Sequence, residues 1–598
     1  MRVVSVAASA TVAEQESLTD MVWANADRFA DAIAFRRRVD GSWIDVTTKD
    51  FAAHVLAVAK GLIASGLEPG DRVALLAATR YEWTLVDFAV WAAGCVTVPV
   101  YETSSAEQVA WILADSGAKA VVVSDPVTRA VVDGVVDRLA EVVKVWQLDV
   151  PGDMTASAID ELAALGAELD DEAAHARRLA VRSSDLATLV YTSGTTGRPK
   201  GVELTHRNLL AEVRANVAAF PHLMRPGNSM LVFLPLANIL ARAIALTCVY
   251  TRTTLGHLPN VRTLVADLAG FRPTFVVAVP RVFEKVYNSA KQRAHGEGRG
   301  SIFAAAEAVA VEYSAAMAGS GPSTALRAKH AVASRLVYAK LRNVLGGRCV
   351  AAISGGAPLG EHLAHFFRGV GIPVYEGYGL TETSAAICVN TREDFRVGTV
   401  GRPVAGAAVR VADDGEIELR GDMVFRGYWR NPAATEEALR DGWLRTGDLG
   451  SLDEDGFLRI TGRKKEIIVT AGGKNVVPAV LEDRVRKHPL VSQCLVVGDR
   501  QPFIAALITL DEDFLPAWAA EHGKTAKDLT DDPDLRAEIQ TAVDAANAAV
   551  SRAEAIREFV VLPRDFTEAA GEVTPSLKLR RDAILKTHAD QIAAIYAR

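Results

Sequence analysis

The segment Tyr191-Thr-Ser-Gly-Thr-Thr-Gly-Arg-Pro-Lys200-Gly-Val202 follows an apolar run from Leu186 to Val190, as a loop follows a strand. Its glycines let backbone amides approach an anion, its hydroxyls donate hydrogen bonds, and Lys200 adds positive charge. The segment therefore predicts a cradle for a polyphosphate. It is not a Walker A loop, because GxxxxGK[ST] is absent. A flexible surface turn would explain a few of these residues, but not all of them in this order. The predicted phosphate-binding residues are Thr192, Ser193, Gly194, Thr195, Thr196, Gly197 and Lys200.

On either side of this loop, apolar runs alternate with helical patterns. Strand–helix–strand repetition at this spacing indicates parallel sheets covered by helices. Residues 301–345 are Ala-rich and mostly helical, with a break at 319–322, and are expected to form an insertion on the surface. The predicted strands are Arg72–Leu76, Val96–Val100, Ala120–Ser124, Thr274–Val279 and Cys349–Ile353, and the predicted helices include Tyr81–Ala93 and Ala106–Ser116.

The pattern changes after residue 400. Asp414-Gly415 joins the apolar run Ala408–Val411 to Glu416–Arg420, and Asp455-Gly456 precedes Phe457–Ile460. An Asp-Gly pair between such runs is a hairpin signal, so a small antiparallel barrel is expected. Farther on, a strand over Ile504–Leu510 and a long helix over Leu535–Phe559 indicate a separate unit.

The predicted fold class is therefore α/β. Residues 1–462 form a large domain of parallel sheets covered by helices, together with the antiparallel barrel. Residues 463–598 form a smaller, mobile α+β domain.

Further segments, in this order along the chain, add to the phosphate loop. They are Ser354-Gly-Gly-Ala-Pro-Leu359, Tyr375-Glu-Gly-Tyr-Gly-Leu-Thr-Glu-Thr383, Trp443-Leu-Arg-Thr-Gly-Asp-Leu449, Gly462-Arg-Lys-Lys-Glu466 and Thr574-Pro-Ser-Leu-Lys-Leu-Arg-Arg581. In order and spacing, the set resembles the motifs of the adenylate-forming acyl-CoA synthetase superfamily, which includes luciferases and peptide-synthetase adenylation domains. The resemblance runs from Gly66 to Arg581 and is closest to the long-chain fatty acid–CoA ligases, which the helical insertion also resembles.

The resemblance implies an ATP site. Asp448 would accept hydrogen bonds from the ribose hydroxyls, as a carboxylate does well. Tyr378 would stack on the adenine, and Arg463 would contact ribose or phosphate. The nucleotide-binding residues implied in this way are Gly355, Gly356, Ala357, Glu376, Gly377, Tyr378, Gly379, Thr381, Asp448 and Arg463.

Joining a carboxylate to ATP brings two anions together, so phosphate charge must be neutralised. Mg²⁺ is the expected agent. The resemblance implies that Thr192 and Glu382 contact this ion. It also implies that Lys578 is the catalytic lysine, which binds α-phosphate and carboxylate oxygens as charge develops. Lys200 and Glu382 complete the predicted catalytic set.

The C-terminal motifs imply a moving domain. Lys465 matches the hinge about which the small domain of the family rotates between half-reactions, and Lys465 and Lys578 are both predicted to approach the nucleotide. Gly473 belongs to Gly472-Gly-Lys-Asn475, which resembles the segment that lines the pantetheine tunnel for coenzyme A.

One position departs from the family. Leu234-Pro-Leu-Ala-Asn-Ile-Leu-Ala-Arg242 carries Asn238 where the family usually has His, near the acyl carboxylate. Asn keeps a donor and an acceptor but carries no charge. Asn238 is therefore the candidate substrate-binding residue, and the departure concerns the adenylation rate rather than the fold.

Composition excludes several classes of protein. Over 598 residues, 66 Lys and Arg against 73 Asp and Glu give 66 − 73 = −7, which argues against a strongly basic nucleic-acid binder. Five scattered cysteines favour neither a disulfide framework nor a zinc site and are typical of a cytoplasmic protein. The apolar run in residues 1–13 is short and weak, so a secretion signal is not expected. The most apolar later stretch, Met230–Tyr250, is interrupted by Pro235 and Arg242, so no membrane span is expected. Peripheral contact with the inner membrane face stays open.

The implied activity is ATP-dependent ligation of a long-chain fatty acid to coenzyme A. The acid and ATP give an acyl-adenylate and pyrophosphate, and the CoA thiol then displaces AMP. One alternative is a fatty acyl-AMP ligase that passes the adenylate to a carrier protein. Another is a non-catalytic acyl or nucleotide sensor, which Asn238 suggests. Retention of Glu382, Asp448, Arg463 and Lys578 argues against the sensor.

Overall fold

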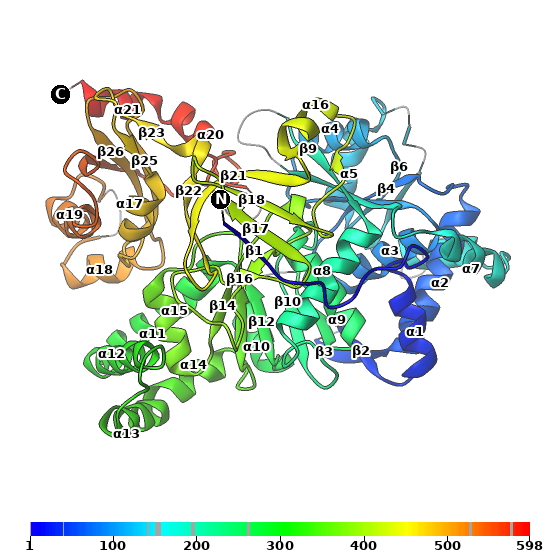
Figure 1. Cartoon of the computed structure of the whole chain (residues 1–598), viewed down its shortest axis with the longest axis horizontal. Helices are drawn as coiled ribbons and strands as arrows, with labels where there is room; N and C mark the ends of the chain where they lie inside the picture. Colours follow the sequence, from blue (N-terminus) through cyan, green and yellow to red (C-terminus); the bar gives the residue numbers. More distant parts are fainter. Residues whose placement is uncertain are drawn as a thin grey trace.

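The computed structural model describes residues 2–39, 41–139, 141–142, 144–149, 157–192, 198–259, 263–525, 529–574 and 578–597. Two mainly parallel sheets stand beside an antiparallel sheet, and an α+β unit follows at the C-terminal end (Figure 1). The α/β class predicted from the sequence is confirmed.

The first sheet has seven strands in the order β19-β9-β8-β5-β4-β6-β7. Its central strands are parallel, whereas β9 is antiparallel to β8 and β19 is antiparallel to β9. The predicted strands Arg72–Leu76 and Val96–Val100 are present as β4 and β5. The others are β6 (Ala118–Val123), β7 (Lys144–Gln147), β8 (Leu186–Thr192), β9 (Lys200–Thr205) and β19 (Gly427–Tyr428).

The second sheet has nine strands in the order β16-β15-β14-β13-β12-β10-β11-β2-β3. Its parallel strands β10 to β14 end at one edge, which is where ligands bind in open α/β sheets. The strands are β2 (Ile33–Val39), β3 (Ser42–Thr47), β10 (Ser229–Val232), β11 (Thr254–His257), β12 (Phe275–Ala278), β13 (Ala351–Ser354), β14 (Val374–Tyr378), β15 (Cys388–Val389) and β16 (Arg402–Pro403).

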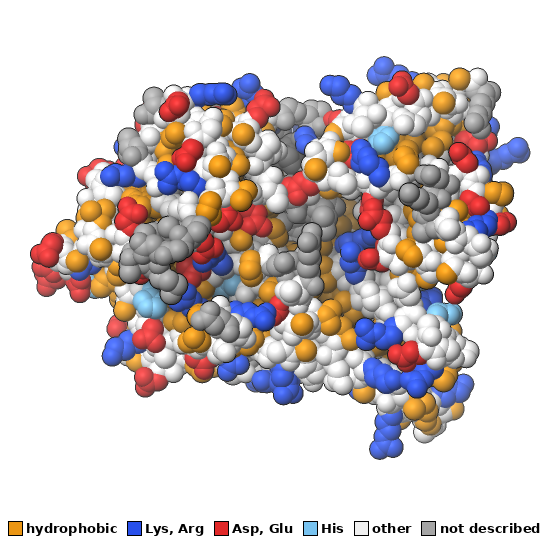
Figure 2. All heavy atoms as spheres, turned by 180° about the vertical axis from the view of Figure 1, so that it is seen from behind, with side chains coloured by type: hydrophobic (Ala, Val, Ile, Leu, Met, Phe, Trp, Pro, Cys, Tyr) orange, Lys and Arg blue, Asp and Glu red, His pale blue; other side chains and the backbone are white. Residues whose placement is uncertain are grey.

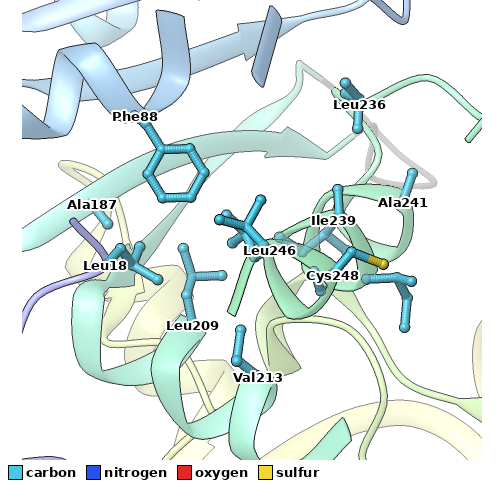
Figure 3. Packing of buried hydrophobic residues seen from close by; sticks show 14 of the residues in the cluster. Leu18, Phe88, Ala187, Leu209, Val213, Leu236, Ile239, Ala241, Leu246 and Cys248 are labelled. Carbon is cyan, nitrogen blue, oxygen red and sulfur yellow. The ribbon is translucent and has the colours of Figure 1, made fainter. Parts of the chain in front are cut away.

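Helices that are apolar on most sides form the main core. In α3 (Tyr81–Ala92) and α9 (Ile239–Thr251) nearly every side chain is buried, as expected of helices covered on more than one face. Figure 3 shows Phe88 of α3, Leu209 and Val213 of α8 (His206–Ala219), and Leu246 of α9 in one cluster. Since residues of both parallel sheets belong to this cluster, the two sheets share one core. Other helices of this region are α1 (Asp20–Arg28), α2 (Thr48–Ala64), α4 (Ala106–Ser116), α5 (Pro126–Val136), α6 (Ala158–Leu165), α7 (Asp171–Ala180) and α10 (Leu264–Phe271).

The antiparallel sheet has six strands. The order is β1-β17-β18-β21-β20, and β22 also pairs with β21, so no pair among the described residues closes a ring. The antiparallel structure expected after residue 400 is thus present as a branched sheet, with the N-terminal strand β1 at its edge. The strands are β1 (Val3–Ser5), β17 (Ala407–Val411), β18 (Glu416–Gly421), β20 (Leu439–Arg440), β21 (Trp443–Leu452) and β22 (Leu458–Arg463), and α16 (Pro432–Ala438) precedes β20.

The expected insertion is helical but only partly superficial. A side chain on Gly369 would collide with the carbonyl of Ala310, so α12 and α15 pack backbone to backbone. Phe303 and Ala310 of α12 are buried in the same cluster as Phe366 of α15. The helices are α11 (Pro280–Gly296), α12 (Gly300–Ala316), α13 (Thr324–Ala333), a π-helical turn (Ser334–Tyr338), α14 (Ala339–Val344) and α15 (Glu361–Val370).

The small domain contains the strand predicted at Ile504–Leu510, here β26, between β25 (Val491–Val497) and β27 (Ile556–Val561). The prediction of one helix over Leu535–Phe559 is wrong. Helix α19 (Pro533–Asn547) ends at Asn547, whose side chain exchanges two hydrogen bonds with the backbone of Ile556. The β-branched residues that follow then pair with β26. The other elements are the hairpin β23 (Ile468–Val469) and β24 (Asn475–Val476), with α17 (Pro478–Val485), α18 (Leu515–Glu521), α20 (Arg581–Thr587) and α21 (Ala589–Tyr596).

All five cysteines, Cys95, Cys248, Cys349, Cys388 and Cys494, are buried and carry free thiols. Burial raises the pKa of each, to about 12 for Cys95 and Cys349, so the reactive thiolate is disfavoured. Within the described residues, no helix is long and apolar enough to cross a bilayer.

Candidate active site

The phosphate loop lies between two paired strands. Thr192 at the end of β8 stands opposite Lys200 at the start of β9. The Trp111 indole donates a hydrogen bond of 3.0 Å to the carbonyl of Pro199, and Arg198 lies 4.6 Å from the centre of the same ring. The pairing and these contacts hold both ends of the loop at one edge of the sheet. The predicted phosphate ligands Ser193, Gly194, Thr195, Thr196 and Gly197 lie outside the described residues.

Tyr428 connects this hairpin to Glu382. Its hydroxyl donates a 2.8 Å hydrogen bond to Glu382 Oε1, and the Lys200 ammonium lies 5.0 Å from the centre of its ring. Burial and then the Glu382 charge raise the pKa of Tyr428, which therefore stays a hydrogen-bond donor. Tyr428 is positioned by β19, where it pairs with Val202. The sequence analysis missed Tyr428, because no motif includes it.

The turn that carries Glu382 has an unusual backbone. Ser384 and Ala385 adopt positive φ angles of 59° and 139°, which side chains other than glycine rarely accept. A side chain on Gly379 would collide with the Ala385 carbonyl, and a Cβ on Gly377 would lie 3.0 Å from Val389 Cγ1. Close packing therefore also explains why glycine stands at these two positions, which were predicted to bind nucleotide. Thr381 starts the same turn and is half-buried.

A buried carboxyl group supports this turn from helix α8. Glu212 Oε1 accepts a 3.1 Å hydrogen bond from the Ala386 amide and one of 3.2 Å from Asn216. Glu212 Oε2 is buried and has no partner among the described residues. Burial raises the pKa of Glu212 to about 8, so the group is mostly protonated at neutral pH. The sequence analysis missed Glu212.

Asp448, Tyr378 and Arg463 form one contact group. Strand register places Arg463 of β22 opposite Asp448 of β21, and their side chains pair at 2.9 Å. The Tyr378 hydroxyl donates to the other Asp448 oxygen at 2.6 Å. Burial and then the Asp448 charge raise the pKa of Tyr378. The arrangement holds the buried Asp448 carboxylate where three elements meet.

A glycine-rich turn follows β13. Gly356 adopts φ +85°, and Gly355 and Ala357 flank it. The turn is held by Glu376, whose Oε1 accepts a 2.9 Å hydrogen bond from the Leu359 amide. Burial raises the pKa of Glu376 to about 8. In this structure Glu376 thus supports the turn through a protonated carboxyl group.

Lys578 of the small domain lies close to this turn. Its Cε lies 3.9 Å from the place that a Cβ on Gly356 would occupy. Although Lys578 is exposed, the surrounding protein atoms and then the Arg463 charge lower its pKa, whereas Asp448 and Glu382 oppose the shift. The Lys578 ammonium therefore lies within electrostatic range of both predicted ligand carboxylates.

Two other predicted residues of the small domain lie outside this contact group. Lys465 is exposed in the turn Lys464–Glu466, while its neighbour Lys464 pairs with Asp414 at 2.6 Å. Gly473 is the positive-φ residue of the β23–β24 turn, and its amide bonds to Thr470 of the same domain. The structure therefore brings Lys578, but not Gly473, to the turn at Gly356.

Two family profiles together match most of the chain. The one described as AMP-binding enzyme matches residues 22–429, and the one described as AMP-binding enzyme C-terminal domain matches residues 465–598. The chain belongs to the AMP-binding enzyme family. It is 52% identical over 603 residues to a Mycobacterium tuberculosis protein named Long-chain-fatty-acid–CoA ligase FadD15, covering 100% of both chains. It is 31% identical over 609 residues to Long-chain-fatty-acid–CoA ligase ACSBG2 of Xenopus laevis, covering 95% of this chain and 82% of that one.

Solved structures of other proteins have the same fold. The adenylation domain of a carboxylate reductase from Mycobacterium chelonae has a TM-score of 0.74 at 21% identity, with 98% of this chain and 91% of that one covered. The anthranilate CoA ligase AuaEII, in complex with anthranoyl-AMP, has a TM-score of 0.73 at 17% identity, with 98% and 99% covered. At this identity the likeness concerns the fold alone.

Asn238, where the family usually has His, has a local structural role. Its side-chain oxygen accepts a 2.9 Å hydrogen bond from the Leu240 amide and so caps the N-terminus of α9. Burial raises the pKa of Tyr101 to about 12, and a hydrogen bond with Asn238 opposes the shift. Within α9, Arg242 pairs with buried Asp87 at 2.5 and 2.8 Å, which fixes the helix in the core. Asn238 is thus held at a defined helix end.

Proposed function

We propose that the chain is a long-chain fatty acid–CoA ligase that uses ATP and forms an acyl-adenylate. The carboxylate oxygen of the acid attacks the α-phosphorus, the bond from that phosphorus to the bridging oxygen breaks, and pyrophosphate leaves. The CoA thiol then attacks the acyl carbonyl, loses its proton, and displaces AMP. The observation that carries the proposal is the approach of Lys578 to Gly356 and to the carboxylates Asp448 and Glu382. Identity of 52% over the whole chain to a long-chain fatty acid–CoA ligase supports the substrate class.

The nucleotide would lie along the contact group described above. Asp448, oriented by Tyr378 and Arg463, accepts hydrogen bonds from the ribose hydroxyls. The adenine packs against the turn at Gly355–Ala357 and the face of Tyr378. Thr192 and Lys200, which the strand pair β8–β9 places opposite each other, would bind the phosphates together with the residues between them in the sequence.

The donor set suits Mg²⁺. Thr192 supplies a hydroxyl and Glu382 a carboxylate, both hard oxygen donors, and Tyr428 orients the carboxylate. Among the described residues, no three acidic, His or Cys side chains are grouped so that they could hold a metal ion by themselves. When bound, the ion would neutralise phosphate charge and act as a Lewis acid.

Lys578 supplies the charge needed for the first step. Its ammonium stabilises the negative charge that develops as the carboxylate attacks the α-phosphate. Glu376 and Glu212, both held protonated by burial, fix the two turns against which the nucleotide is placed. Neither adds a second negative charge beside the phosphates.

The test measures three products with palmitate: pyrophosphate, palmitoyl-AMP and palmitoyl-CoA. The ligase predicts continuous pyrophosphate release with CoA and a palmitoyl-CoA yield that matches it. A single burst of pyrophosphate that CoA does not affect would replace the proposal with a fatty acyl-AMP ligase. If no pyrophosphate is released either with or without CoA, the proposal would be replaced by a non-catalytic sensor. Asp448→Asn keeps the shape of the side chain but weakens ribose binding. As the matched control, it should release less pyrophosphate than the parent, because the measured turnover depends on nucleotide binding at this site.

A further inference from the structure

The segment that includes α13 and α14 contains basic residues but no acidic ones. Between Glu312 and Glu361 the sequence contains six Lys and Arg but no Asp or Glu, although the whole chain has a net charge of −7. Five of the six are exposed and form no ion pair with any described residue; they are Arg327, Lys329, Arg335, Lys340 and Arg348. The segment is a local cationic surface on an acidic protein.

His330 orients helix α13. Its Nε2 lies 2.6 Å from the carbonyl oxygen of Gly369, and its ring stacks on Tyr313 with the centroids 3.9 Å apart. Leu326 and Ala333 lie on the same side of the helix and are buried. The residues on the opposite side therefore turn away from the protein.

That outer side carries apolar side chains. Val332 near the end of α13 and Leu336 in the π-helical turn that continues it are 59% and 58% exposed, and they lie about one turn apart on one side. Exposed Ala328 precedes them by one turn, and exposed Lys329 and Arg335 flank them. In Figure 1, α13 lies at the outer edge of the molecule. Figure 2, seen from behind, shows Lys and Arg side chains beside hydrophobic ones at that end, at lower right.

We infer that the surface formed by Ala328, Lys329, Val332, Arg335 and Leu336, called here the α13 surface, docks the protein onto an anionic lipid bilayer. A helix with an apolar stripe between basic side chains lies in the plane of the headgroups, where the stripe enters the lipid and the charges meet anionic headgroups. Each basic side chain that lies near an anionic bilayer surface strengthens membrane binding about fivefold. A nucleic-acid site would need aromatic or amide side chains, which the α13 surface lacks. The inference goes beyond the proposed function, because docking requires no turnover.

The test is flotation of the full chain with vesicles. We expect binding to phosphatidylcholine mixed with phosphatidylglycerol, weak binding to phosphatidylcholine alone, and release at high salt. The double variant Val332→Ser with Leu336→Ser should bind at least about tenfold more weakly, because it loses the apolar stripe. The pair Lys329→Glu with Arg335→Glu should lose at least about 25-fold. Since all four side chains are exposed, the variants should keep the melting temperature of the parent.

Matched controls lie on the opposite side of the large domain. Val127→Ser changes a side chain that is 75% exposed, and Arg138→Glu with Lys144→Glu changes exposed bases near β7. These controls should bind vesicles like the parent. Equal losses in controls and α13 variants would overturn the inference, as would binding that ignores Val332 and Leu336. Binding of a single-stranded RNA that requires Lys329 and Arg335, without vesicle binding, would also overturn it.

Discussion

The two halves of the candidate site are built differently. On the large domain, buried hydrogen bonds hold the turns: Glu376 to Leu359 and Glu212 to Ala386. The contacts between the small domain and the large one include ion pairs, of which Lys464 with Asp414 is exposed and Arg281 with Asp511 is half-buried. Exposed pairs contribute about 0–1 kcal/mol each, whereas a broken buried hydrogen bond leaves an unsatisfied group that costs about 1–3 kcal/mol. We therefore expect the large-domain half to stay rigid and the small domain to dock and leave between half-reactions, and the variants below test this expectation.

The largest expected effect separates Lys578 from the rest of the small domain. Lys578→Ala should reduce pyrophosphate formation about 10²–10³-fold, because one preorganised cation is lost from the candidate site. Conversion of supplied palmitoyl-AMP to palmitoyl-CoA should persist. Rapid-quench measurement of each half-reaction checks this. Lys586→Ala removes an exposed lysine of α20 and should leave both rates unchanged. Equal losses in both half-reactions would show that Lys578 does not serve the first alone.

The second variant tests whether docking must be reversible. Lys465→Pro fixes φ in the exposed turn that joins the domains. Pyrophosphate formation should be kept, while palmitoyl-CoA formation from palmitoyl-AMP should fall by about tenfold or more. Lys465→Ala, which leaves φ free, is the control. If the alanine variant loses as much as the proline variant, the side chain rather than rotation is responsible.

A smaller effect is expected at the domain contact. Arg281 of α11 pairs with Asp511 of the small domain at 3.1 Å and bonds to Ser492 at 3.0 Å. Arg281→Ala should slow pyrophosphate formation by no more than about fivefold, or about 1 kcal/mol, because the pair is half-buried and its arginine stays in contact with solvent. The difference in rate between Arg281→Ala and the parent should become smaller as the salt concentration rises, because salt screens the ion pair in the parent. Arg129→Ala breaks an exposed pair with Asp133 within α5 and should have no effect. A loss beyond fiftyfold would mean that the docking is not weak.

The smallest effect concerns the rigid half. Burial raises the pKa of Glu212 from 4.5 to about 8, so between these values the folded chain keeps a proton that the unfolded chain releases. Unfolding of the parent therefore becomes easier by about 1.4 kcal/mol per pH unit from pH 5 to pH 8 through this group. Gln cannot ionise, so the melting temperature of Glu212→Gln relative to the parent should rise over that range, by ~1 °C per pH unit for a chain of this size.

Melting curves across that pH range, with exposed Glu312→Gln as the control, measure this difference. The control should run parallel to the parent. A Glu212→Gln difference that stays flat would mean that Glu212 is ionised in the folded chain.

The strands and the motif residues were accessible from the sequence, because apolar runs and glycine-rich turns are local signals. Tyr378, Asp448 and Arg463 were predicted for one site, and they are in contact. Glu212 was missed because a glutamate within a helix usually faces solvent, and its burial depends on distant Ala386. The false helix over Leu535–Phe559 has the same cause, since pairing of β27 with β26 ends the helical pattern.

Because all five native cysteines are buried, the chain can be labelled with thiol-directed dyes at cysteines that are introduced on its surface. Their thiols are enclosed and held protonated, so a maleimide would react first with a cysteine introduced on the surface. Val127 on the large domain and Arg500 on the small domain, whose side chain is 91% exposed, are suitable positions for such a pair. Energy transfer between two dyes there would follow the small domain in single molecules as ATP, palmitate and CoA are added in turn. No native cysteine would first have to be replaced.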